Sequence, residues 1–205
     1  MWEVLIAVGL GTGDPELLTL KAVRLLREAD AVFVPGKLAH RLVKQHRPDA
    51  TLLEFPMTDD DGHIQKCLER NAMMMAPVAV EGLAVFGIIG DPNLFSTFSR
   101  VCEVISREHP DVEFGTVPGI TSVTAFASAA KIPISSGFIV DDGNGVNGIV
   151  RLKVTAPAAE ARRMRVEGYR EFVLVERISM NDEKVYSGDN LPEKSNYFSV
   201  LYARR

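Results

Sequence analysis

The sequence predicts an α/β fold in two parts, with a mostly parallel sheet in the first part and a mixed sheet in the second. Short runs that are aliphatic throughout alternate with helical segments over the first half of the chain. Strands that are apolar on both faces and separated by helices are typical of a parallel sheet covered on both sides. After Pro118 the composition changes to small residues, followed by a loop rich in glycine and asparagine. We therefore predict two α/β domains, residues 1–116 and 117–205.

The first part contains five apolar runs that predict strands. They are residues 4–8, 31–34, 51–55, 83–89 and 112–116. Three segments between them have the spacing of amphipathic helices. They are residues 15–28, 64–75 and 94–106.

Two helices and three strands are predicted in the second part. Its opening stretch "PGITSVTAFASAAK", residues 118–131, is a helix of small residues. Strands are predicted near residues 149–154, 172–176 and 198–203, with one helix over residues 157–166 among them.

Composition excludes several classes of partner. The chain has 205 residues and a net charge of −4, which argues against a general nucleic-acid-binding surface. No apolar run approaches the roughly 20 residues that a membrane helix needs, and the first residues lack the basic region of a signal peptide. Cys67 and Cys102 are far apart and match no metal-binding spacing, so free thiols and no metal site are expected. We expect no nucleic-acid or membrane partner and a cytoplasmic location.

The tripeptide Gly-Asp-Pro occurs twice, at residues 13–15 and 90–92, each time after an aliphatic run. If both runs are parallel strands, both turns lie at their carboxyl ends, where open α/β sheets bind ligands. Helix capping is an alternative explanation, because Asp is a preferred N-cap and Pro is favoured at the first helical position. The dinucleotide fingerprint fails, since its sixth position is Asp14 and no acidic residue ends the second strand.

Three motifs in order resemble those of the tetrapyrrole methylases, enzymes of corrin and siroheme synthesis that use S-adenosylmethionine. "VGLGTGDPELLTLKA" at residues 8–22 is similar to the family's opening motif, and the second Gly-Asp-Pro is similar to its next one. "VPGITS" at residues 117–122 is similar to the third. Together the motifs extend from residue 8 to about residue 126.

The stretch "GDPNLFSTFS", residues 90–99, most resembles the precorrin-2 and cobalt-precorrin-2 C(20)-methyltransferases, as does the C-terminal "NLPEKSNYFSVLYARR". This resemblance implies methylation of carbon 20 in cobalamin biosynthesis. Three residues depart from the family pattern: Thr12 replaces Pro, Asn93 replaces Thr and Phe95 replaces Tyr. Methylation of carbon 11 or 17, diphthine synthesis, and a non-catalytic nucleotide-binding module stay open as alternatives. The absence of a Walker-type lysine counts against the last of these.

The resemblance also implies the ligands and their residues. It places S-adenosylmethionine, which leaves as S-adenosylhomocysteine, in a cleft between the two domains, and it implies a homodimer. The implied cofactor-binding residues are Ile89, Gly90, Asp91, Leu94, Thr121, Ser122, Lys153, Val154 and Ile178.

The tetrapyrrole substrate would carry several carboxylates, which require local positive charge. Lys37 and Arg41 offer it at helical spacing after the second strand. No catalytic residue is identified, because alignment of an activated methyl donor and exclusion of water need no catalytic triad. The predicted substrate-binding set is Gly11, Thr12, Gly13, Asp14, Lys37, Arg41, Ser96 and Thr97.

Overall fold

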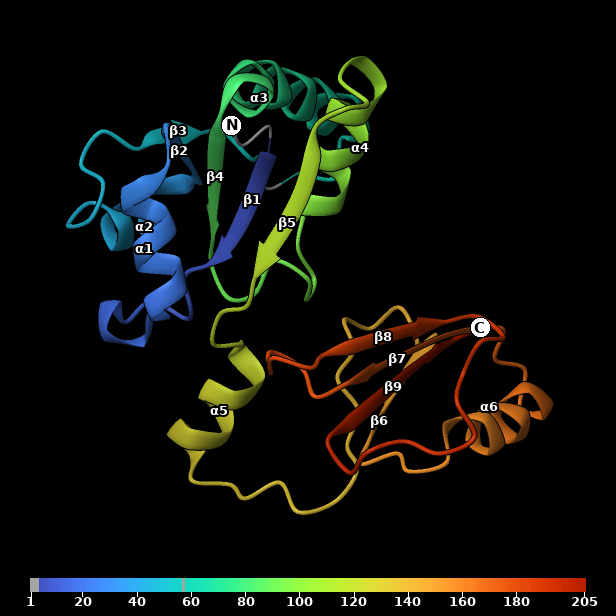
Figure 1. The fold of residues 1–205 in the computed structure, drawn as a ribbon. Helices are drawn as coiled ribbons and strands as arrows, with labels where there is room; N and C mark the ends of the chain where they lie inside the picture. Colours follow the sequence, from blue (N-terminus) through green and yellow to red (C-terminus); the bar gives the residue numbers. More distant parts are fainter. Residues whose placement is uncertain (1–3, 57) are drawn as a thin grey trace. The chain divides into compact units, whose positions relative to one another are not determined.

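A computed structural model describes residues 4–56 and 58–205, and its backbone divides into two compact units, Met1–Ser135 and Ser136–Arg205 (Figure 1). Each unit has its own sheet and its own core. The division falls later than the boundary expected between residues 116 and 117. The difference arises because the segment after residue 116 is still tied to the first unit, through the backbone N–H of Gly119, which donates to Asp91 Oδ2 at 3.0 Å.

The first unit contains a five-stranded sheet in the order β3-β2-β4-β1-β5. Every pairing between these strands is parallel, which confirms the predicted parallel sheet. β1 lies between β4 and β5, with Val8 opposite Gly87 on one side and Val117 on the other. The strands are β1 (Val4–Gly9), β2 (Ala31–Pro35), β3 (Thr51–Leu53), β4 (Leu83–Ile88) and β5 (Glu113–Val117).

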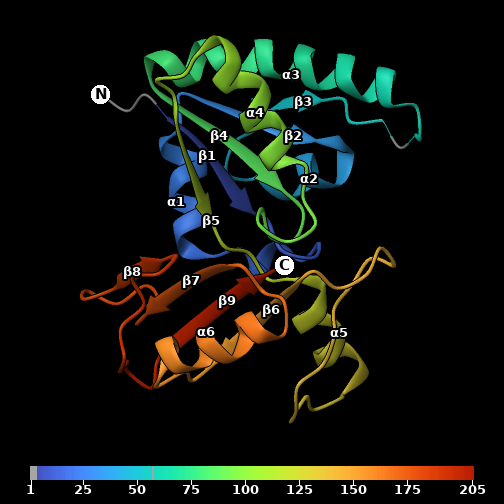
Figure 2. The same cartoon turned by 90° about the vertical axis from the view of Figure 1, so that its right-hand side faces the viewer.

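Helices cover both faces of this sheet. α1 (Leu20–Glu28) and α2 (Gly36–Val43) lie on one face, and α3 (Asp61–Glu81) and α4 (Phe98–Glu108) on the other (Figures 1 and 2). Each face has a hydrophobic core of its own, one containing Leu26 and the other containing Phe86. Because both faces are buried, ligands can reach the sheet only at the ends of its strands.

Two helices begin later than the sequence predicts. The first Gly-Asp-Pro turn starts a short 3-10 turn over Pro15–Leu17, and α1 begins only after Thr19, whose Oγ1 accepts a hydrogen bond from Ala22 N at 3.1 Å. α4 likewise begins at Phe98, where Ser96 Oγ accepts from Phe98 N at 3.0 Å. The prediction was wrong at the start of α1 because Thr19, further along the segment, caps that helix. At α4 the N-cap residue is Thr97, which makes no side-chain capping hydrogen bond. α3, in contrast, is longer than predicted and passes through Pro77.

The second unit contains a four-stranded sheet in the order β6-β9-β7-β8. α6 (Pro157–Val166) packs on it with a core that includes Met164, Phe172 and Leu201. The strands are β6 (Gly148–Leu152), β7 (Glu171–Glu176), β8 (Lys184–Ser187) and β9 (Ser199–Arg204).

This second sheet is antiparallel in all its pairings, so the predicted mixed sheet was wrong. The crossover through α6 makes β6 and β7 run in the same direction, but β9 lies between them and pairs with both. The strand β8 was not predicted, because its sequence Lys-Val-Tyr-Ser is short and largely exposed. The small-residue helix was predicted and is present as α5 (Ser122–Ala130).

Across residues 4–56 and 58–205, the structure contains no helix with both the length and the apolar character needed to cross a bilayer.

Arg47 closes the C-terminal end of α1. Its guanidinium donates to the backbone carbonyls of Leu26 at 3.3 Å, of Asp30 at 3.0 Å and of Ala29. Its side chain is only 15% exposed and also pairs with Asp49. Three carbonyls at and just beyond the end of α1 thus depend on one partly buried cation.

We predict that Arg47→Ala lowers the free energy of unfolding by about 1–3 kcal/mol, because partly buried carbonyls lose charged donors. Urea denaturation followed by circular dichroism measures this. Arg24→Ala is the matched control, since Arg24 is 57% exposed and pairs with Glu28 one turn away. The control should cost about 0.5 kcal/mol or less. Equal losses in the two variants would contradict the role given to Arg47.

Candidate functional site

The two Gly-Asp-Pro turns lie side by side at the carboxyl edge of the first sheet. β1 and β4 are neighbouring parallel strands, with Gly9 opposite Ile88, so the chain leaves both strands at the same place. The turns are joined directly: Gly90 N donates to Gly11 O at 2.7 Å, and Gly11 N donates to Gly90 O at 3.3 Å. The repeated tripeptide therefore marks two touching loops.

The loop after β5 packs against both turns. A Cβ atom added at Gly119 would lie 2.2 Å from Gly90 O and 2.7 Å from Gly9 Cα. A Cβ atom added at Gly9 would lie 2.4 Å from Gly119 N. These distances are far below van der Waals contact, so only glycine permits the three backbones to meet.

Asp91 fastens this arrangement. Its Oδ2 accepts from Gly119 N at 3.0 Å, and its Oδ1 accepts from Asn93 N at 2.8 Å. The carboxylate thus joins the loop after β4 to the loop after β5, and it does not cap α4. Asp14 has the other role: it is exposed, and its Oδ1 accepts from Glu16 N at 2.9 Å at the start of the 3-10 turn. The capping explanation therefore applies to the first Gly-Asp-Pro only.

The three loops border a hollow with a volume of about 340 Å³. Six of the nine predicted cofactor-binding residues line it, together with Thr12 from the predicted substrate set and with Phe95, which belonged to neither set. α5 begins at this hollow, where Thr121 Oγ1 accepts from Thr124 N at 3.3 Å. Its N-terminus directs unpaired N–H groups and partial positive charge outward, which suits an anionic ligand group. The lining residues are Thr12, Ile89, Gly90, Asp91, Leu94, Phe95, Thr121 and Ser122.

The other three predicted cofactor residues, Lys153, Val154 and Ile178, belong to the second unit. They follow the ends of β6 and β7, which flank the beginning of β9. Val154 N donates to the carbonyl of Ser199 at 3.3 Å, so this edge is held by backbone hydrogen bonds. Lys153 has a positive φ of 61°, and the hydroxyl of Tyr197 raises its pKa, which keeps it charged. Within the second unit the sheet thus gathers these three residues at one edge.

The predicted substrate residues do not form a single site. Gly11, Thr12, Gly13 and Asp14 lie in the loop after β1, but only Thr12 lines the hollow. Ser96 and Thr97 lie outside it.

Lys37 borders a separate hollow of about 480 Å³, formed with Leu53 and Phe55 where β2 and β3 end. Arg41 follows one turn later on α2 and is exposed. Lys37 and the hollow lined by Thr12 therefore lie at the same carboxyl edge of the sheet. Lys37 follows β2, whereas that hollow lies at the ends of β1, β4 and β5.

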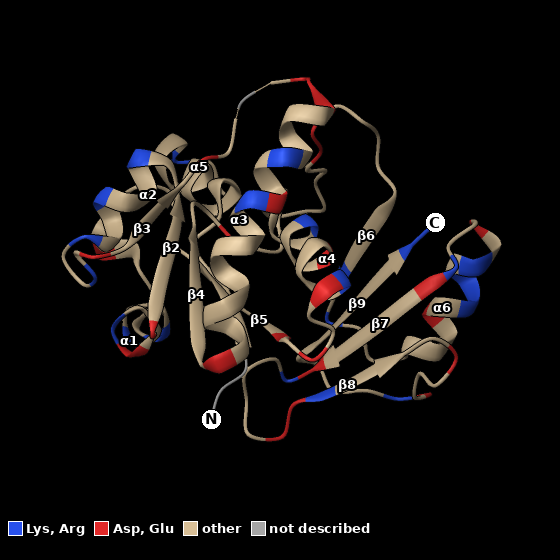
Figure 3. Ribbon diagram, turned by 90° about the horizontal axis from the view of Figure 1, so that it is seen from above, with Lys and Arg blue, Asp and Glu red and all other residues tan. Residues whose placement is uncertain are grey.

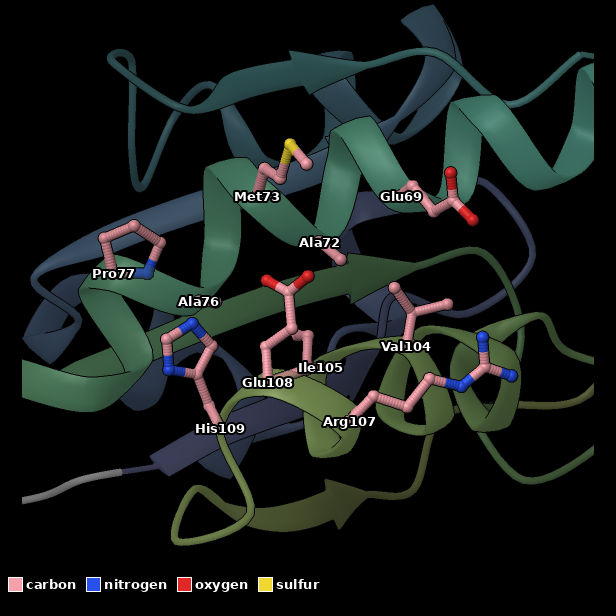
Figure 4. Close-up of a pocket in the computed structure, with 10 residues that line it drawn as sticks. All are labelled: Glu69, Ala72, Met73, Ala76, Pro77, Val104, Ile105, Arg107, Glu108 and His109. Carbon is pink, nitrogen blue, oxygen red and sulfur yellow. The ribbon is translucent and has the colours of Figure 1, made fainter.

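A further hollow of about 280 Å³ lies between α3 and α4 (Figure 4). The side chains of Glu69, Arg107, Glu108 and His109 surround an apolar floor there. It contains no residue of the three motifs, so it is separate from the site at the strand ends.

Cys102 is not an activated nucleophile. Cys67 and Cys102 are both free thiols, and burial raises the pKa of Cys102 to about 12, so it stays protonated at neutral pH. Among the described residues, no group of His, Cys, Asp and Glu is arranged to hold a metal ion. What the site offers is a rigid backbone floor, hydroxyl groups and a helix N-terminus.

Sequence reasoning missed Phe95 as a lining residue. A signal was present, since an aromatic side chain follows the second Gly-Asp-Pro by three positions. Its position at the hollow depends on its backbone conformation, with φ at 49°. No local sequence pattern predicts this conformation.

We predict that Gly119→Ala lowers the free energy of unfolding by about 1–3 kcal/mol, because the added methyl group must displace backbone atoms of the neighbouring loops. Thermal denaturation measures the loss. Gly115→Ala is the control, since its Cβ would meet only Ile6 Cγ1 at 3.6 Å, an ordinary contact. If Gly119→Ala melts no lower than the control, the close packing of the loops is not required.

Comparisons with known proteins agree with the three motifs. Residues 4–190 match the family model of the Tetrapyrrole (Corrin/Porphyrin) Methylases. The chain is 31% identical over 221 residues to a protein of Methanocaldococcus jannaschii named "Probable cobalt-precorrin-2 C(20)-methyltransferase", covering 97% of this chain and 94% of that protein. It is 32% identical over 129 residues to the Uroporphyrinogen-III C-methyltransferase of Cyanidium caldarium, covering 62% of this chain and 50% of that one.

The fold agrees as well. The solved structure of a cobalt precorrin-4 methyltransferase aligns with a TM-score of 0.50 and 21% identity, covering 98% of this chain and 95% of that one. The family match spans most of the chain, and it confirms the resemblance that the motifs predicted. The chain therefore belongs to the tetrapyrrole (corrin/porphyrin) methylase family and is a methyltransferase.

Proposed function

We propose that this protein methylates carbon 20 of precorrin-2 or cobalt-precorrin-2 in cobalamin biosynthesis, using S-adenosylmethionine and releasing S-adenosylhomocysteine. The observation that carries the proposal is the similarity to the Methanocaldococcus jannaschii protein, which extends over 97% of this chain. The stretch "GDPNLFSTFS" supports the same subtype.

The hollow at the three loops is the proposed binding place for the methyl donor. Its volume of about 340 Å³ lies in the lower part of the range of small-molecule sites, about 300–1,000 Å³. Thr121 and Ser122 offer hydroxyls, and the N-terminus of α5 offers partial positive charge to a carboxylate. Lys153, Val154 and Ile178 stay a prediction from the family resemblance.

The protein's contribution to the reaction is alignment and exclusion of water. When bound, S-adenosylmethionine supplies an electrophilic methyl group to a nucleophilic carbon of the ring. The closely packed backbones of Gly9, Gly90 and Gly119 form a rigid base for the site, and Asp91 links two of the loops. A rigid site holds the two reactants in one geometry. The entropy cost of bringing them together is then met on binding and does not add to the reaction barrier.

Lys37 and Arg41 are proposed to bind substrate carboxylates. Within residues 4–56 and 58–205, neither side chain takes part in an ion pair with an acidic residue. The arginines of α6, prominent in Figure 3, are different: Arg162, Arg163 and Arg165 each pair with an acidic residue. The cations on α2 are therefore among those that an anionic ligand could pair with. A homodimer and a cytoplasmic location complete the proposal.

The decisive experiment incubates the protein with S-adenosylmethionine and precorrin-2, with and without cobalt in the ring. Mass spectrometry should show one added methyl group, and NMR should place it on carbon 20. A methyl group on carbon 11 or 17 would overturn the assignment to the carbon-20 subtype. Calorimetry with S-adenosylhomocysteine is the companion measurement, since absence of binding would favour a protein without methyl-transfer chemistry.

We predict that Lys37→Glu combined with Arg41→Glu raises the KM for the tetrapyrrole about tenfold or more, because two attractive charges become repulsive. The affinity for S-adenosylhomocysteine should be unchanged. Steady-state kinetics and calorimetry measure the two quantities.

The matched control for this pair is Arg27→Glu combined with Arg107→Glu, which makes the same change in net charge. These residues lie near the ends of α1 and α4 that lead to the opposite edge of the sheet. An equal rise of KM in both double variants would mean that net charge alone steers the substrate, and the assignment of Lys37 and Arg41 would fall.

A further inference from the structure

Phe95 has a backbone conformation that an aromatic residue rarely adopts. Its φ is 49°, in the left-handed region, where a side chain costs free energy that glycine avoids. Burial does not compensate, because Phe95 is 64% exposed. Strained residues of this kind persist where the surrounding structure forces them, and they cluster at ligand-binding sites.

The segments on both sides of Phe95 are fixed. Before it, Leu94 N donates to the carbonyl of Asp91 at 3.3 Å, and the Asn93 side-chain amide donates to Thr116 Oγ1 at 3.0 Å. After it, Ser96 Oγ accepts a hydrogen bond from Phe98 N at 3.0 Å, and Phe98 is buried in the core. Phe95 joins two anchored turns, so its backbone is held at the edge of the hollow.

The ring is part of an apolar rim. Leu17, Leu94 and Ile120 are also exposed large hydrophobic residues, and Leu94 lines the same hollow as Phe95. Leu17 and Ile120 border Gly11: a Cβ atom there would lie 3.7 Å from Leu17 Cβ and 3.8 Å from Ile120 Cβ. The hollow thus has hydroxyls within and exposed carbon surface around it.

The size of the hollow separates the two ligands of the proposed function. About 340 Å³ can hold one compact ligand. A tetrapyrrole macrocycle with carboxylate arms does not fit into the same space beside a methyl donor. Its flat, conjugated surface must lie across the rim, where the exposed ring of Phe95 can stack on it.

We propose that Phe95 is a positioning residue for the tetrapyrrole, which stacks on the plane of the macrocycle and sets its height above the methyl donor. This inference rests on the proposed function. It assigns the ring to the macrocycle and not to the adenine of the donor.

The test uses the full chain and three variants: Phe95→Leu, Phe95→Gly and the matched control Phe138→Leu. Phe138 is 57% exposed and lies in the second unit, outside the loops that border the hollow. Three quantities are measured: KM and kcat with cobalt-precorrin-2, the affinity for S-adenosylhomocysteine by calorimetry, and the melting temperature.

We expect Phe95→Leu to raise the KM for cobalt-precorrin-2 about three- to tenfold, the range that aromatic stacking gives, while the affinity for S-adenosylhomocysteine stays within about twofold. Phe95→Gly should raise KM further and also raise the melting temperature, because glycine relieves the strained φ. Phe138→Leu should leave all three quantities unchanged. A purely structural role would change the melting temperature without this division between the ligands.

Two results would overturn the inference while the proposed function stands. One is a wild-type KM in both Phe95 variants; the other is a loss of S-adenosylhomocysteine affinity as large as the rise in KM. If the wild-type protein neither binds nor methylates cobalt-precorrin-2, the proposed function fails, and the role of Phe95 fails with it.

Discussion

The close approach of three backbones, at Gly9, Gly90 and Gly119, is the constraint on which the site depends. A Cβ atom at Gly119 would lie 2.2 Å from Gly90 O, so no other residue fits there. The approach follows from the strand order, since β1 lies between β4 and β5 and the chain leaves all three at one edge. Once the loops are in contact, the side chain of Asp91 bridges two of them. The lining of the hollow then comes from residues that are far apart in the sequence but follow neighbouring strands.

Burial of both faces of the first sheet explains why function is concentrated at this edge. α1 and α2 close one face and α3 and α4 the other, and each side has a continuous apolar core. The chemical groups at the remaining carboxyl edge differ from one set of strands to the other. Hydroxyls and a helix N-terminus lie at β1, β4 and β5, whereas a cation lies at β2 and β3. A compact, polar ligand beside a broad, anionic one matches this division better than a dinucleotide does, because the acidic residue that would bind its ribose is missing from the sequence.

The second unit also gathers predicted ligand-binding residues at one edge of its sheet, although that sheet is antiparallel. β9 separates β6 from β7 and pairs with both, so their ends flank the beginning of β9. The buried hydroxyl of Ser199 lies there within 2.6 Å of Ser195 Oγ, which in turn donates to Glu176 Oε1. Lys153 and Arg177, beside this cluster, both have positive φ values, of 61° and 53°. Polar contacts and antiparallel pairing thus fix the backbone where the family resemblance predicts ligand-binding residues.

Hydrophobic runs and glycine motifs by themselves determined much of this protein. They identified every strand of the parallel sheet and the family, because buried strands and loops that must lack side chains leave local signatures. The family resemblance then supplied seven of the eight residues that line one hollow. Other features depended on contacts between distant segments. Asp91 was a possible helix cap until Gly119 supplied its partner, and Asp14 stayed one. The antiparallel second sheet, the weak strand β8 and the left-handed Phe95 have no local pattern. Only the tertiary structure decided them, because strand partners and loop anchors lie far away in the sequence.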